Sequence, residues 1–117
     1  MPDHKRSIVV PKDLEAMQAL DFDEAADEQL VSWDLSDADF TVLWQSGVFS
    51  ILNSELSCLI DDYEDEQIID GTQIETASRI VEELQRSAST EAVSGLARLH
   101  TLCLEGQRRN TGVFFFF

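Results

Sequence analysis

The most suggestive group of reactive side chains in the sequence is a run of carboxylates around one tyrosine. Six consecutive positions hold Asp61, Asp62, Tyr63, Glu64, Asp65 and Glu66. Such a run offers negative charge and hydrogen-bond acceptors to a cleft lined by Lys or Arg, and the tyrosine adds an aromatic anchor. We therefore predict that these six residues lie at or near the interface with a basic protein partner.

The acidic run directly follows an apolar stretch that ends at Ile60. If a helix ends there, the carboxylates face the negative end of its dipole, and if the helix continues, they repel one another at i,i+3 and i,i+4. Either arrangement lowers local stability, which use by a partner would explain. The alternative is that these residues are solvated in an exposed turn or open a further short helix, and the sequence leaves both interpretations open.

Metal binding and thiol chemistry are the other options, and the spacing favours neither. An EF-hand loop needs Gly at its sixth position, where counting from Asp61 gives Glu66. His100 and Cys103 lie three apart on one helical face and Cys58 lies elsewhere, but a fourth zinc ligand is missing. A thiol on an apolar helix face is usually inert. We expect buried free thiols, no metal and no cofactor.

The glycines stand singly, and no phosphate loop, nucleophile elbow or zinc-protease motif is present. We therefore expect a non-enzymatic protein.

The negative charge is concentrated in one part of the chain. Between Asp13 and Ser78 there are 18 Asp or Glu and no Lys or Arg, so this segment carries a charge of −18 and the rest of the chain +3. A net charge of −15 repels nucleic acid and anionic lipid and attracts cationic proteins. We expect no direct binding to nucleic acid or membrane.

At 117 residues and 44% hydrophobic composition, the chain is expected to fold as one globular domain, residues 1–117. Residues 1–12 lack the apolar core of a signal peptide, and the longest apolar run is residues 113–117. We therefore expect a cytoplasmic protein. The composition sets no oligomeric state.

Three segments are predicted to be strands: residues 7–10, 30–35 and 113–117. The last is apolar throughout, which is typical of a strand buried on both faces, and residues 7–10 are its candidate neighbour. A short helix is predicted over residues 12–20, where apolar residues recur every three positions. The predicted class is α+β, mostly helical, with a small β-sheet that includes the C-terminal strand.

Longer helices are predicted in the middle and the second half of the chain. Ser36 is expected to cap a helix whose apolar face runs from Phe40 to Tyr63, with a kink at Ser46–Gly47. Thr72 and Glu75 match a capping box for the next helix, and a last helix is expected to start at Thr90 and to be closed by Gly106.

The two tryptophans are interpreted differently. Trp44 fits the apolar face of the central helix and is expected in the core. Trp33, flanked by Ser32 and Asp34, is a candidate for an exposed anchor in an interface. We therefore include Trp33 among the predicted partner-binding residues.

In size, charge and layout, the chain resembles the small acidic immunity proteins of bacterial toxin–immunity pairs. The segments that carry this resemblance are Leu43-Trp44-Gln45-Ser46-Gly47 to Glu66 and the closing Arg109-Asn110-Thr111-Gly112-Val113-Phe114-Phe115. Such immunity proteins include inhibitors of contact-dependent growth-inhibition toxins. The resemblance implies a cytoplasmic inhibitor of a cationic toxin, such as an RNase or DNase domain. It carries over no functional residue. An acidic regulatory adaptor or nucleic-acid mimic that binds a basic cellular protein is the alternative.

Overall fold

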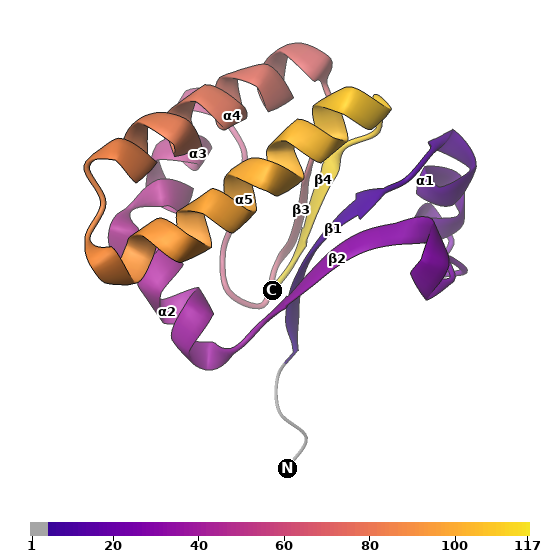
Figure 1. Ribbon diagram of the computed structural model, residues 1–117. Helices are drawn as coiled ribbons and strands as arrows, with labels where there is room; N and C mark the ends of the chain where they lie inside the picture. Colours follow the sequence, from indigo (N-terminus) through magenta and orange to yellow (C-terminus); the bar gives the residue numbers. More distant parts are fainter. Residues whose placement is uncertain (1–4) are drawn as a thin grey trace.

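Five α-helices and a four-stranded antiparallel sheet are formed within residues 5–117, the part of the chain described by the computed structural model (Figure 1). The elements in chain order are β1 (Arg6–Pro11), α1 (Leu14–Asp21), a short 3₁₀ helix (Asp27–Gln29), β2 (Leu30–Leu35), α2 (Asp37–Ser46), α3 (Val48–Leu56), β3 (Asp65–Ile68), α4 (Gly71–Arg86), α5 (Thr90–Arg109) and β4 (Val113–Phe116). The predicted α+β class, with β4 in the sheet, is confirmed.

The sheet has the strand order β2-β1-β4-β3, and every neighbouring pair is antiparallel. Ile8 of β1 lies opposite Trp33 of β2 on one side and Phe115 of β4 on the other. The predicted pairing of the last strand with the first is therefore confirmed. β3 was not predicted, because its sequence Asp-Glu-Gln-Ile is too polar to resemble a buried strand.

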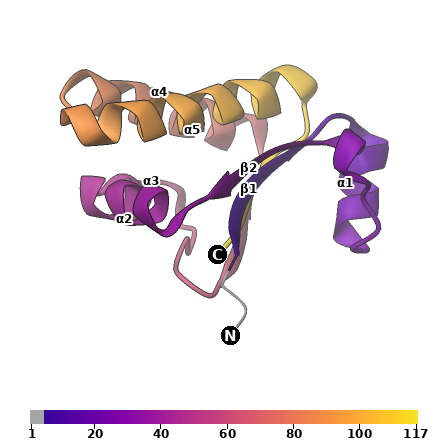
Figure 2. The same ribbon diagram turned by 60° about the horizontal axis from the view of Figure 1, so that its bottom comes forward.

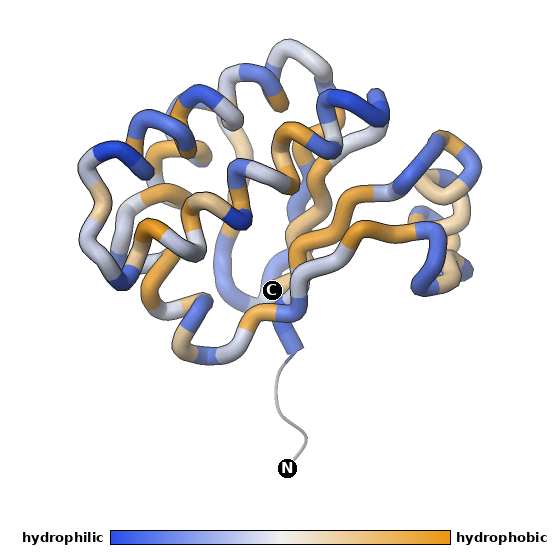
Figure 3. The backbone as a smooth tube through the Cα atoms, viewed as in Figure 1, coloured by the Kyte–Doolittle hydropathy of each residue, from blue (hydrophilic) through white to orange (hydrophobic). Residues whose placement is uncertain are grey.

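The helices α2 to α5 lie together on one side of the sheet, and α1 lies apart from them near the end of β1 and β2 (Figures 1 and 2). Apolar segments of the strands and of the helices face one another between these layers (Figure 3). The core that fills this space includes residues that are at most 2% exposed: Ile8, Val10, Leu43, Val48, Phe49, Leu52, Ile74, Val81, Leu96, Leu99 and Phe115.

The single long helix expected from Phe40 to Tyr63 is wrong. α2 ends at Ser46, and Gly47 has a left-handed backbone with φ +84°, a conformation that glycine adopts without strain. α3 then ends at Leu56, because Ser57 also has positive φ. The first break lies at the predicted kink, Ser46–Gly47, whereas the break at Ser57 was not predicted, because the apolar spacing of the sequence continues across it.

Two helix ends also differ from the prediction, whereas the Ser36 cap is confirmed. The cap of α4 is Asp70, whose side chain accepts hydrogen bonds from the backbone N–H groups of Thr72 and Gln73. α5 continues to Arg109, and the left-handed residue that closes it is Asn110. Gly106 is instead buried inside α5, where a Cβ would lie 3.1 Å from Val113 Cγ2.

Candidate functional site

The first four residues of the acidic run form a loop and the last two, Asp65 and Glu66, begin β3, so the run neither ends a helix nor continues one. Its backbone is tied to the residue that follows β4. Tyr63 N–H donates to the Phe117 carbonyl oxygen at 2.8 Å, and Phe117 N–H donates to the Glu64 carbonyl oxygen at 3.2 Å. These two hydrogen bonds hold the loop beside the C-terminal end of β4.

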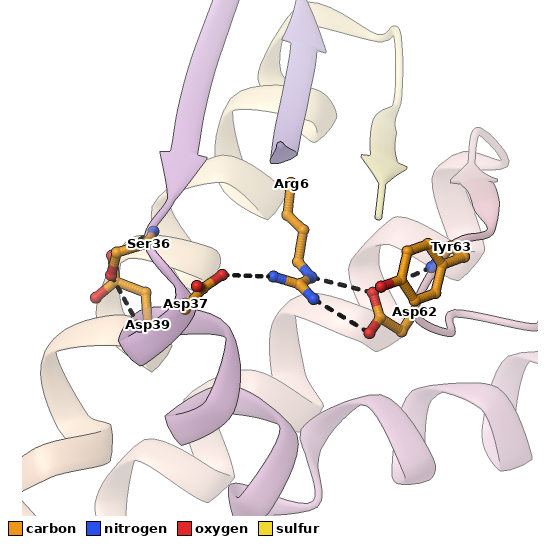
Figure 4. Close-up of polar contacts among 6 residues, drawn as sticks. All are labelled: Arg6, Ser36, Asp37, Asp39, Asp62 and Tyr63. Atoms are coloured by element: carbon orange, nitrogen blue, oxygen red, sulfur yellow. Dashed lines mark hydrogen bonds and ion pairs between the residues drawn. The ribbon is translucent and has the colours of Figure 1, made fainter. Parts of the chain in front are cut away.

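Arg6 links this loop to the start of α2 (Figure 4). Its Nε and Nη2 atoms donate to the two carboxylate oxygens of Asp62 at 3.0 and 3.1 Å, and Nη1 donates to Asp37 Oδ1 at 2.8 Å. The guanidinium carbon also lies 4.2 Å from the centre of the Phe40 ring. The hydrogen bond to Asp62 raises the pKa of Arg6, so the clamp stays charged. Sequence analysis missed Arg6, which is 56 residues from Asp62.

Several carboxylates of the run have structural partners inside the protein. Asp62 binds Arg6, and Asp61 Oδ1 accepts from the Asp62 N–H at 2.8 Å. Glu66 accepts from the N–H groups of Leu59 and Gln67 at 2.8 and 2.9 Å. The expectation that the run lowers local stability is therefore wrong for Asp62 and Glu66, because both hold the local backbone in place.

The remaining carboxylates are presented to solvent. Asp61, Glu64 and Asp65 are exposed, and within residues 5–117 no cationic side chain forms an ion pair with them. Tyr63 is 73% exposed. Asp62 and Glu66 thus fix the shape of the loop, Asp61 is exposed and also accepts the Asp62 N–H, and Tyr63, Glu64 and Asp65 are exposed.

The roles of the two tryptophans are the reverse of the prediction. Trp33 is 3% exposed, and the Arg98 guanidinium lies 4.9 Å from its ring, so Trp33 cannot be an exposed anchor. It points inward because strand residues alternate, with Ser32 and Asp34 outward. Trp44 is 45% exposed at the edge of the apolar stripe of α2, with its ring 5.7 Å from that of Phe40.

A hollow of about 350 Å³ lies between Trp44 and the start of the acidic loop. Asn53 shapes it by holding residue 60: its amide nitrogen donates to the Ile60 carbonyl oxygen at 2.9 Å, and its amide oxygen accepts from the Ile60 N–H at 2.7 Å. As a result Leu59 is 61% exposed at the rim. The lining residues are Trp44, Phe49, Ser50, Asn53, Leu59, Ile60 and Asp61.

The hollow places Trp44, Leu59 and Asp61 side by side, and Arg6 connects Asp62 of the loop to Asp37 at the start of α2. Asp65 lies opposite Phe116 in the sheet, so its side chain is on the other face of β3 from Glu66 and Phe115. We define the acidic face as the exposed residues at this hollow, in the loop that follows it and at the Arg6 pair of α2: Asp37, Asp61, Glu64, Trp44, Leu59 and Tyr63. The acidic residues come from two segments far apart in sequence, so only the fold brings them together.

The cysteines are both free thiols. Cys103 is buried as predicted, and desolvation raises its pKa to about 12. Cys58 is only half-buried; burial and the nearby Glu66 raise its pKa as well. His100 Nε2 lies 3.9 Å from a carboxylate oxygen of Glu82. Among residues 5–117, no three His, Cys, Asp or Glu side chains are arranged to hold a metal ion.

No helix within the described part of the chain combines the length and the apolar character needed to cross a membrane. No family model, curated protein or solved structure matches the chain.

Replacing Arg6 by alanine should lower the free energy of unfolding by about 1–3 kcal/mol, because hydrogen bonds to charged groups are lost and Asp62 stays behind without the guanidinium. Urea unfolding measures this loss, and amide hydrogen exchange at Tyr63 should speed up as the loop loosens. The matched control is Arg86→Ala, whose pair with Glu82 is exposed and should contribute far less. Equal losses in the two variants would contradict the role of Arg6 as a clamp.

Proposed function

We propose that the protein is a non-enzymatic inhibitor of the immunity type, which binds a cationic toxin in the cytoplasm and neutralises it through the acidic face. The observation that carries this proposal is that the exposed Trp44 and Leu59 lie beside the Asp61 carboxylate at one hollow, with the exposed Tyr63 and Glu64 on the same loop as Asp61. Large apolar and aromatic side chains that protrude among charges are typical of protein interfaces, where they become the buried anchors.

A nuclease domain is the favoured class of toxin. Enzymes that bind nucleic acid line their sites with Lys and Arg, because phosphate contacts dominate their affinity. A surface with Asp61 and Glu64 exposed complements such a site in charge. The net charge of −15 adds a long-range attraction that speeds encounter.

The loop is also organised before it binds. The Arg6 clamp, the Asn53 bonds and the backbone pairing at Tyr63 and Glu64 all fix its position in the unbound protein. A partner therefore does not have to order the loop, and less of the binding energy is lost as conformational entropy.

The test is inhibition of a panel of cationic nuclease toxin domains, including any encoded beside the gene for this chain. Raising salt from about 50 mM to about 500 mM should slow association at least roughly tenfold, because screening shortens the reach of the charges. Stopped-flow fluorescence gives the association rate, and cleavage of RNA or DNA gives the inhibition. Association that does not change with salt would overturn electrostatic capture, and specific binding to a DNA-binding regulator in place of any nuclease would overturn the assignment to a toxin.

A further inference from the structure

The hollow beside Trp44 lies next to an arginine site that the protein already fills with its own side chain. Arg6 pairs with Asp37 and Asp62 (Figure 4). Its guanidinium carbon also lies over the Phe40 ring, 4.2 Å from the ring centre. This arrangement combines an aromatic face with carboxylates, which suits a guanidinium because it is planar, weakly hydrated and permanently charged.

An aromatic ring and a carboxylate occur together a second time, next to the Arg6 site, on α2 and in the acidic loop. Trp44 follows Phe40 by four residues, so both lie on one side of α2, and their rings are stacked at 5.7 Å. Asp61 directly precedes Asp62 in the loop. Trp44 and Asp61 line the hollow together, and within residues 5–117 no cation forms an ion pair with Asp61.

The remaining lining suits the stem of a long side chain. Leu59 supplies exposed apolar surface for methylene groups above the buried Phe49 and Ile60, and the exposed Ser50 adds a hydroxyl. At about 350 Å³ the hollow has room for one such side chain.

We propose that this hollow binds one arginine side chain of the partner, with its guanidinium on the Trp44 indole and paired with the Asp61 carboxylate. The inference rests on the proposed function and deepens it, because it names the chemical group that the acidic face recognises. Arginine is preferred over lysine, since only a guanidinium can stack on the indole and form a forked hydrogen bond to the carboxylate.

The experiment uses the full chain with two blocked peptides, hexa-arginine and hexa-lysine, which have the same charge. The protein has two tryptophans, so an NMR spectrum of ¹⁵N-labelled protein shows two indole N–H signals, which Trp44→Phe assigns. Hexa-arginine should shift the Trp44 signal saturably and leave that of the buried Trp33 in place. Hexa-arginine should also bind at least about threefold more tightly than hexa-lysine.

Variants distinguish binding in the hollow from non-specific attraction to the negative charge of the protein. Trp44→Leu keeps apolar bulk but removes the aromatic face, and it should weaken hexa-arginine binding about tenfold with little effect on hexa-lysine. Asp61→Asn should weaken hexa-arginine binding more than Glu83→Gln does, although both remove one negative charge; Glu83 lies exposed on α4. Thermal unfolding of each variant confirms that it is folded.

Three results would overturn the proposal: a Trp44 signal that does not move, equal affinity for the two peptides, or equal losses from Asp61→Asn and Glu83→Gln. None of them requires a toxin, so the outcome is independent of the nuclease panel. Inhibition of a nuclease without arginine selectivity would leave the proposed function standing and remove only this inference. Arginine selectivity without inhibition of any nuclease would support the arginine site and contradict the proposed function.

Discussion

Replacement of Asp61, Glu64 and Asp65 by lysine should weaken binding to a cationic nuclease by at least about 100-fold, because attraction at the acidic face and at the neighbouring start of β3 becomes repulsion. Most of the change should appear in the association rate at low salt, measured by stopped-flow mixing. These three side chains are suited to reversal because they are exposed and form no ion pair within residues 5–117; reversal of Asp61 removes only the bond that its side chain accepts from the neighbouring Asp62 N–H. Asp62 and Glu66 are not suited to reversal, since it would break the bonds that hold the loop.

The matched control reverses three exposed carboxylates on α4 and α5, Glu75, Glu83 and Glu91. Both triple variants change the net charge by the same amount, so long-range attraction falls equally in both. Only the first removes charge from the proposed interface. Similar losses of affinity in the two variants would show that total charge, and not the acidic face, determines binding.

Phe115→Ala should lower the free energy of unfolding by about 3–5 kcal/mol, a large part of the stability of a domain of this size. Phe115 is fully buried at the centre of the sheet, with ring centres 6.2 Å from Phe49 and 5.7 Å from Phe117. Its loss leaves a cavity that the packed neighbours cannot fill. Urea unfolding followed by circular dichroism measures the change.

The same substitution at Phe22 is the control, because that side chain is 65% exposed. Phe22→Ala should leave the urea midpoint almost unchanged. If Phe115→Ala had an equally small effect, the arrangement of β4 at the centre of the sheet would be wrong.

The parts of the fold that were predicted correctly depend on local patterns. The cap at Ser36, the apolar face of α4 and the apolar strand β4 each have a signature within a few neighbouring residues. The pairing of β4 with β1 also followed, because a strand buried on both faces needs a neighbour. Local chemistry therefore sets most of the elements.

The parts that were missed depend on contacts between distant segments. Nothing near Arg6 in the sequence indicates that it binds Asp62, and β3 is a strand because it pairs with β4, not because of its composition. Trp33 and Trp44 exchanged roles for a related reason. The sequence of β2 does not show which face of the strand the helices cover, and this decides the burial of Trp33. The apolar stripe of α2 does not show which of its residues lie at the exposed edge, as Trp44 does.

The acidic loop is held mainly by backbone atoms at the residues that would face a partner. The bonds at Tyr63, Glu64 and Phe117 join N–H and carbonyl groups, which every residue except proline supplies in full. Substitution of Glu64 or Asp65 therefore alters what the surface recognises while the path of the chain stays the same. A lineage with this fold can follow a changing partner by small steps in the loop, because its recognition surface and its scaffold evolve under separate constraints.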